Sequence, residues 1–349
     1  MATIVKTPAG TWKALIRKQG WPTVTKIFRI KRDAEDWARR TEDEMVRGAF
    51  IQRSPSEKMT LAIAMKRYLS EVSPTKKLTS QRSELSKSKP LVKHLGKYSL
   101  AGITPDIVAG YRDTRLADKS RTGTISNNTV RLELALLSHL FTTAIQEWAL
   151  GLTYNPVLAI RKPSAGQGRD RRLSETEELK LITAVNSHSN PMLGWIVRIA
   201  IETGMRSSEI SSLKCNQVNL KSRVVKLTDT KNDDSRTVPL SRKATDALQA
   251  ALDNPRPAET NLVFFGEPGR DGKRRPFTFT KVWSTIKKEI GMPDLRFHDL
   301  RHEAVSRFVE MGLGDQQVAA ISGHKSMQML KRYTHLRGED LVAELDKRC

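Results

Sequence analysis

The chain has 349 residues, of which 60 are Lys or Arg and 38 are Asp or Glu, giving a formal net charge of +22 at pH 7. Such a surface attracts a polyanion, although charge alone leaves a basic protein of the ribosomal or membrane-surface kind equally open. The two cysteines lie far apart and match no metal-ligand spacing, so neither a disulfide framework nor a zinc knuckle is indicated. The length predicts two or three domains, and without a bilayer-spanning apolar run we expect a soluble, cytoplasmic protein.

Residues 1–55 are predicted to form a small sheet followed by a helix. Residues 11–17 and 23–29 alternate bulky and polar side chains around a Gly-Trp-Pro turn, which indicates a hairpin. Asp33 is expected to be the N-cap of a helix that ends at Gly48. The apolar stripe that would cover the hairpin consists of Ala34, Trp37, Ala38, Thr41 and Met45. The basic surplus of this segment is consistent with contact to DNA, and a dimerisation or packing module stays open.

Residues 56–155 are predicted to be all-helical, because apolar residues recur there at three- and four-residue intervals. The expected helices span 61–71, 80–95, 105–118 and 126–148. Asn127 and Asn128 are the expected caps of the last helix. Residues 156–172 are rich in Pro, Gly, Ser and Arg, which do not sustain a regular helix, so we interpret them as an interdomain linker.

Residues 173–349 are predicted to mix helices with a small sheet. Ser174 and Glu177 have the spacing of a capping box that opens a helix. Short strands are expected at 217–220, 223–227 and 236–240. Residues 231–235 make a good hairpin turn between the last two of these strands.

Four stretches of this last segment carry residues suited to chemistry. They read TGMRSSEI at 203–210, TKN at 230–232, HDLRH at 298–302, and GH at 323–324 followed by RYTH at 332–335. Together and in this order they resemble the tyrosine recombinase or phage integrase family. Catalytic domains of that family carry an Arg, a Lys on a hairpin, a His-x-x-Arg, a second His or Trp, and a Tyr.

The resemblance covers the catalytic half and, more loosely, the two upstream segments. It implies a multidomain, mainly α fold with small β-sheets. Residues 1–55 would be an N-terminal β-sheet plus helix arm-binding domain for DNA, and residues 56–155 an all-helical, SAM-like core-binding domain. Residues 173–349 would be the mixed α/β tyrosine recombinase catalytic domain with its C-terminal tail.

The resemblance assigns a phosphate clamp to two arginines. Phosphodiester transfer develops negative charge on the non-bridging oxygens, and guanidinium groups stabilise it through charge-assisted hydrogen bonds. Arg206 and Arg301 match these positions. Gly204 is expected to allow a tight backbone approach before Arg206, and Glu209 to orient nearby side chains. Taken singly, either arginine could instead simply pair with Glu209 or Asp299.

Tyr333 matches the nucleophile of the family, which attacks phosphorus and conserves the bond energy as a 3′-phosphotyrosine. Lys231 matches the general acid that protonates the leaving 5′-oxygen. His298, three residues before Arg301 on the same helical face, is suited to proton transfer or hydrogen bonding at the phosphate. His324 would contact a non-bridging oxygen by similarity. Ser326 is expected to cap a short helix that carries Tyr333.

Three other functions stay open. His298 and His302 at i and i+4, with His324 and His335 nearby in sequence, permit a metal-dependent hydrolase. A non-catalytic DNA-binding regulator on the same architecture is the second, and a type IB topoisomerase, which uses the same covalent intermediate as a monomer, is the third. The resemblance favours a recombinase that needs no metal, nucleotide or other cofactor.

The expected partners are double-stranded DNA attachment sites, both core and arm sites, and three further copies of the chain in a tetramer that exchanges strands through a Holliday junction. Accessory bending proteins or an excisionase are compatible with this. Integration and excision of a prophage or genomic island is the expected role, with the protein associated with the nucleoid. The apolar stripe of residues 336–349 would dock in trans on a neighbouring protomer, as in the family, or in cis.

Overall fold

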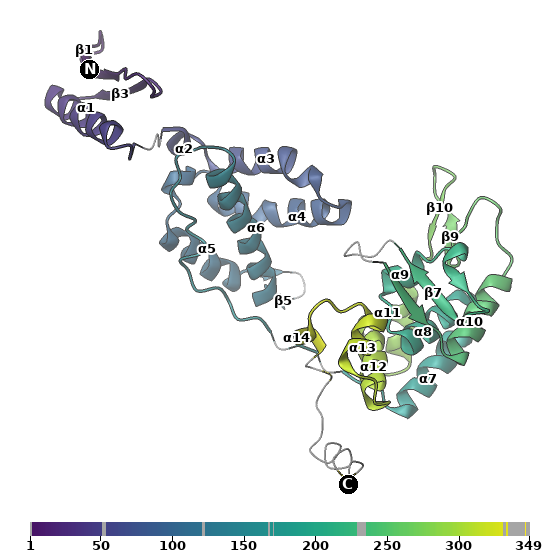
Figure 1. The fold of residues 1–349 in the computed structure, drawn as a ribbon. Helices are drawn as coiled ribbons and strands as arrows, with labels where there is room; N and C mark the ends of the chain where they lie inside the picture. Colours follow the sequence, from purple (N-terminus) through teal and green to yellow (C-terminus); the bar gives the residue numbers. More distant parts are fainter. Residues whose placement is uncertain are drawn as a thin grey trace. The chain divides into compact units, whose positions relative to one another are not determined.

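The structure is a computed structural model. It describes residues 2–50, 54–120, 123–166, 168–169, 171–228, 235–330, 333 and 346. The chain divides into two compact units, residues 1–167 and 168–349 (Figure 1). The finer division into three domains and a linker stays a prediction. Within the described residues, no helix is both long and apolar enough to cross a bilayer.

The first unit begins with an antiparallel sheet in the order β1 (Ala2–Lys6), β2 (Trp12–Ile16) and β3 (Val24–Phe28). The predicted hairpin of β2 and β3 is confirmed, and β1 was not expected. Ala14 and Ile16 of β2 are fully buried on the side of the sheet that packs against α1 (Lys31–Val46). The buried positions of α1 follow the expected stripe: Ala34, Ala38, Thr41 and Met45.

The expectation that Asp33 caps α1 is wrong. The helix begins at Lys31, with Ile30 at the N-cap and no side-chain capping bond. Asp33 instead lies in the first turn, where its negative charge interacts favourably with the exposed N–H groups of the helix start.

The rest of the first unit is helical. It contains α2 (Ser54–Lys58), α3 (Leu61–Glu71), α4 (Leu78–Leu95), α5 (Pro105–Ala117), α6 (Asn127–Gln146) and a short β4 (Lys119–Ser120) and β5 (Gly123–Thr124) pair. The four expected helices are therefore present, and their inward faces share one apolar core. Ser126 caps α6 by accepting from the backbone N–H of Thr129 at 3.2 Å, so the expected caps Asn127 and Asn128 are wrong. Both asparagines lie inside the first helical turn.

The second unit surrounds a helix whose surface is mostly apolar and buried. This helix, α8 (Met192–Thr203), packs against α7 (Glu175–Asn186), α10 (Arg242–Asp253) and α12 (Phe297–Glu310). A helix with so wide an apolar surface is stable only when other elements cover it. The capping box of Ser174 and Glu177 at the start of α7 is confirmed.

The predicted strands of this unit are present as the antiparallel sheet β6 (Val218–Asn219), β7 (Val224–Leu227) and β8 (Arg236–Pro239). A second pair, β9 (Phe265–Pro268) and β10 (Arg274–Pro276), was not expected. The remaining helices are α9 (Ser207–Ser211), α11 (Thr280–Glu289), α13 (Asp315–Ser322) and α14 (Met327–Leu330). Thus the chain is a mainly α protein with small antiparallel sheets, as expected.

Candidate active site

The end of α8 places the first candidate, Arg206. Gly204 stops the helix with φ of 62°, a left-handed conformation that favours glycine. Arg206 follows in extended conformation as the N-cap of α9. Its backbone N–H and its guanidinium donate to the two carboxylate oxygens of Glu209, at 2.8 and 2.7 Å. The supporting carboxylate therefore fixes both ends of the arginine.

Glu209 also holds a second arginine that sequence reasoning missed. Arg236, the first residue of β8, donates to Oε1 and Oε2 of Glu209 at 3.0 and 2.6 Å, and its Nε donates to the carbonyl of Ile321 at 3.2 Å. Burial acts to raise the pKa of Glu209, but hydrogen bonds and charge from Arg236 and Arg206 outweigh it and lower the pKa to about 2. The carboxylate is ionised and joins α9 to β8, and Arg236 extends this link to the end of α13.

Arg301 lies on α12 and is only 3% exposed. It donates to the carbonyl of Gly204 at 2.5 Å and to Nε2 of His324 at 3.3 Å. Burial and the neighbouring positive charges of Arg206 and Arg236 lower its pKa to about 10, although Glu209 opposes this. The group stays charged at neutral pH. Several cations concentrated where water is largely excluded attract an anion strongly.

His324 is placed by a second left-handed glycine. Gly323 ends α13 with φ of 71°, and its carbonyl accepts from Arg206 at 3.0 Å. Because a guanidinium only donates, Nε2 of His324 accepts from Arg301, and Nδ1 carries the proton toward Ser322 Oγ at 2.7 Å. Burial, and then the charges of Arg301 and Arg206, lower the pKa of His324 to about 4, so the ring is neutral at pH 7.

Tyr333 lies in a turn past α14, where its backbone N–H donates to the carbonyl of Leu330, rather than on a helix as expected. Its hydroxyl shares a hydrogen bond with Nδ1 of His302. The Tyr333 ring centroid lies 5.7 Å from that of His302 and 6.1 Å from that of His324. His298 stacks edge-on against His302 at 4.9 Å. The structure thus brings the expected Tyr and histidines together with His302.

His302 had entered the sequence argument only as a possible metal ligand. Its i+4 spacing from His298, and its position directly after Arg301, were the signals that could have placed it in this site. Within the described part of the chain, no group of three or more His, Cys, Asp or Glu side chains is arranged to hold a metal ion. In the structure, His302 is instead a hydrogen-bond partner of the Tyr333 hydroxyl.

Lys231 lies outside the described residues. The strands that flank it are described: β7 and β8 pair in antiparallel register up to Leu227 and Arg236. Arg332 and all but one residue of the tail are also outside the description. Among the six expected catalytic residues, the structure therefore brings together Arg206, His298, Arg301, His324 and Tyr333.

Comparison with known proteins gives consistent matches. Residues 171–339 match the model of the phage integrase family. The shufflon-specific DNA recombinase of Escherichia coli is 44% identical over 297 residues, which are 83% of this chain and 73% of that protein. A putative integrase/recombinase of Haemophilus influenzae is 33% identical over 344 residues, 95% of this chain and 86% of the relative. A lambda integrase tetramer bound to a Holliday junction has a TM-score of 0.59 at 19% identity, covering 93% of this chain and 95% of its own.

Proposed function

The chain belongs to the phage integrase family and is a site-specific tyrosine recombinase, and from this premise we propose that it exchanges DNA strands through a covalent bond between Tyr333 and a 3′-phosphate. The observation that carries the proposal is the position of the Tyr333 hydroxyl. It is bonded to His302 and lies next to a cluster of cations that suits a phosphodiester.

In the proposed reaction, the phenolic oxygen of Tyr333 forms a bond to phosphorus while the bond from phosphorus to the 5′-oxygen breaks. Arg206 and Arg301 stabilise the charge that develops on the non-bridging oxygens. Since a guanidinium has five N–H donors, each can keep its protein acceptor and still bind a phosphate oxygen. His298 adds a hydrogen bond at the phosphate. His324 adds one as the tautomer that carries its proton on Nε2, once the bound phosphate replaces Nε2 as the acceptor from Arg301.

Proton transfer completes the step. The phenolic proton passes to His302, which already shares a hydrogen bond with the hydroxyl. The leaving 5′-oxygen takes a proton from Lys231, carried by the connection between β7 and β8. The 5′-hydroxyl of another strand then attacks the phosphotyrosine in the reverse sense, so joining needs no nucleotide.

The outer face of the N-terminal sheet supports contact with DNA arm sites. Residues on the side of the sheet opposite α1 alternate with the buried ones, as the pleat requires. Val5 and Ile27 are exposed by 55% and 59%, and Lys13 lies between them in the strand register. A sheet face with exposed apolar and basic side chains suits a DNA groove.

We further propose a tetramer on two synapsed DNA sites, with strand exchange through a Holliday junction, as in the lambda integrase assembly. Integration and excision of a prophage or genomic island is the proposed role. Inversion is the second candidate role, because the same strand exchange inverts the intervening DNA when the two sites lie in inverted orientation. The relative orientation of the protein's own two sites separates the two roles, because strand exchange deletes the DNA between direct sites and inverts the DNA between inverted sites.

The central test uses purified protein, in EDTA, with DNA that flanks its own gene, stopped with SDS. We expect protein linked to a 3′ end, and no adduct with Tyr333→Phe although DNA affinity changes little, because one hydroxyl is lost from a large interface. An adduct that persists in Tyr333→Phe would contradict the nucleophile assignment. Binding without any adduct in the unaltered protein would favour a non-catalytic DNA-binding regulator.

A further inference from the structure

Helix α12 has two chemically opposite sides. With 3.6 residues per turn, His298, Arg301, His302 and Val305 fall on one side, whereas Asp299, Glu303 and Glu310 fall on another. Asp299 and Glu303 are 2% and 1% exposed. Buried carboxylates are tolerated only when cations or hydrogen-bond donors compensate them. Their partners therefore determine how this side of the helix is held.

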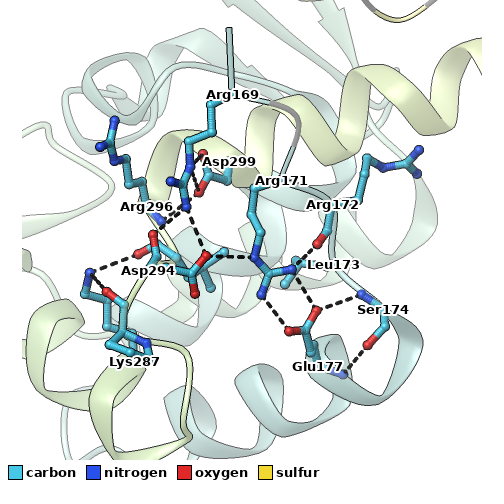
Figure 2. Close-up of polar contacts among 12 residues, drawn as sticks. Arg169, Arg171, Arg172, Leu173, Ser174, Glu177, Lys287, Asp294, Arg296 and Asp299 are labelled. Carbon is cyan, nitrogen blue, oxygen red and sulfur yellow. Dashed lines mark hydrogen bonds and ion pairs between the residues drawn. The ribbon is translucent and has the colours of Figure 1, made fainter. Parts of the chain in front are cut away.

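The compensating cations come from the lead-in segment, residues 169 and 171–173, where the chain enters the second unit. Arg169 Nε donates to both carboxylate oxygens of Asp299, at 3.1 and 3.0 Å (Figure 2). The same carboxylate accepts the backbone N–H of Arg296 at 2.8 Å, at the start of α12. One side chain thus links the lead-in segment to the turn that carries His298.

A second link lies one helical turn further along. Arg172 donates to both oxygens of Glu303, at 2.8 and 3.1 Å, and also to Glu310 at 2.7 Å. The backbone N–H of Leu173 donates to Glu303 at 3.0 Å. Arg172 and Arg307 outweigh burial and keep the pKa of Glu303 low. Asp299 and Glu303 each lie two residues from Arg301, so the two links hold α12 on either side of this arginine.

The loop before α12 is tied to the same segment. Asp294 accepts from Arg171 Nε at 3.1 Å and from Arg169 at 3.2 Å, and its carbonyl also accepts from Arg169 (Figure 2). Lys287 of α11 donates to the carbonyls of Pro293 and Leu295 and holds this loop from its other side. The lead-in segment is therefore not a passive tether within this unit.

We propose that Arg169 and Arg172 are positioning residues, which through Asp299 and Glu303 set α12 so that Arg301 and His298 meet the scissile phosphate. Neither arginine touches the reacting atoms. The inference rests on the proposed strand cleavage. It adds that the lead-in segment controls the rate of that cleavage.

The test compares Arg169→Met, Asp299→Asn and the double variant in single-turnover adduct formation at saturating DNA. We expect Arg169→Met to slow the adduct about 100-fold, since small displacements of catalytic groups have effects of that size. DNA affinity should change little. Asp299→Asn keeps an acceptor for Arg296, and the double variant should be no slower than Arg169→Met alone, because the two residues act through one contact. Arg275→Met, which removes an exposed ion pair with Asp271, is the matched control.

Amide hydrogen exchange of residues 297–303 without DNA gives a readout that does not require activity. Exchange should accelerate in Arg169→Met and stay unchanged in Arg275→Met. The proposal is overturned if α12 exchange is unaltered, or if the slowing multiplies in the double variant, or if only DNA affinity falls. Absence of an adduct with the unaltered protein would count against strand cleavage itself, whereas altered exchange would still report on the α12 contacts.

Discussion

At the scale of single residues, one buried carboxylate organises the cations of the site. Glu209 accepts hydrogen bonds from Arg206 and Arg236. Arg301 lies close to these two arginines, and their positive charges add to burial in lowering its pKa. One negative charge among three positive ones leaves a surplus for a phosphate. Burial strengthens that attraction because the local dielectric constant is low. Burial and the same positive charges keep His324 neutral.

The lowered pKa of His324 predicts a stability that depends on pH. The folded protein holds the ring neutral with a pKa near 4, whereas the unfolded chain takes up a proton below the ordinary value of 6.5. The stabilising contribution is therefore complete above pH 6.5 and is lost as the pH falls toward 4, by on the order of 2 kcal/mol. Urea unfolding at pH 7.5, 6 and 4.5 measures it.

The control for this effect is His324→Gln, which does not titrate. The difference in unfolding free energy between the unaltered protein and His324→Gln should shrink as the pH falls. If the two proteins lose stability in parallel, His324 does not carry the effect. Glu209, with its pKa near 2, loses its contribution only at lower pH, between 4.5 and 2.

At the scale of elements, two helix ends position the site. Helices α8 and α13 both end at a left-handed glycine, Gly204 and Gly323, and each is followed within two residues by a site residue. Each glycine carbonyl also accepts from a clamp arginine, Arg301 or Arg206. The glycines therefore provide both the turn and an anchor for the guanidinium.

Gly323→Ala should slow adduct formation by more than its loss of folding stability explains. A Cβ at Gly323 would lie 2.8 Å from a guanidinium nitrogen of Arg236, so the turn that carries His324 must shift. Gly312→Ala is the matched control, because Gly312 has φ of 82° and open space around its Cβ position. Both should lose about 1–2 kcal/mol of stability from the left-handed backbone. Equal adduct rates for the two would contradict the role of the turn.

At the scale of the whole molecule, charge and the outer sheet face together predict how DNA binding responds to salt. The net charge of +22 favours displacement of counterions from DNA, so the logarithm of the association constant should fall steeply and linearly with the logarithm of salt concentration. Lys13→Ala, on the exposed sheet face, should reduce the slope for arm-site DNA by about 0.9. Arg40 is exposed on α1, and Arg40→Ala should leave this slope unchanged. Equal effects of the two would argue against the sheet face as the contact.

Local patterns determined much of this protein. The three- and four-residue periodicity gave the helices of the first unit, and the spacing of Ser174 and Glu177 gave the start of α7. These features depend on neighbours along the chain. The order of the motifs indicated the family, and five of the six expected catalytic residues lie together. The predicted caps of α1 and α6 were wrong for different reasons: α1 begins at Ile30 without any side-chain cap, and at α6 the backbone geometry selects Ser126 among several polar residues.

Only the tertiary structure decided which side chains complete the site. Arg236 meets the carbonyl of Ile321 across 85 positions, and Arg169 meets Asp299 across 130. No local period encodes such pairs, because they form when separately folded helices and strands pack around α8. The sequence by itself therefore determined the helices of the first unit, one sheet of the second unit and the residue types of the chemistry, but not β1 or the β9 and β10 pair. Packing decided that Glu209 is shared by two arginines, that His302 partners Tyr333, and that the lead-in segment holds α12, since burial forces each charge to find a partner.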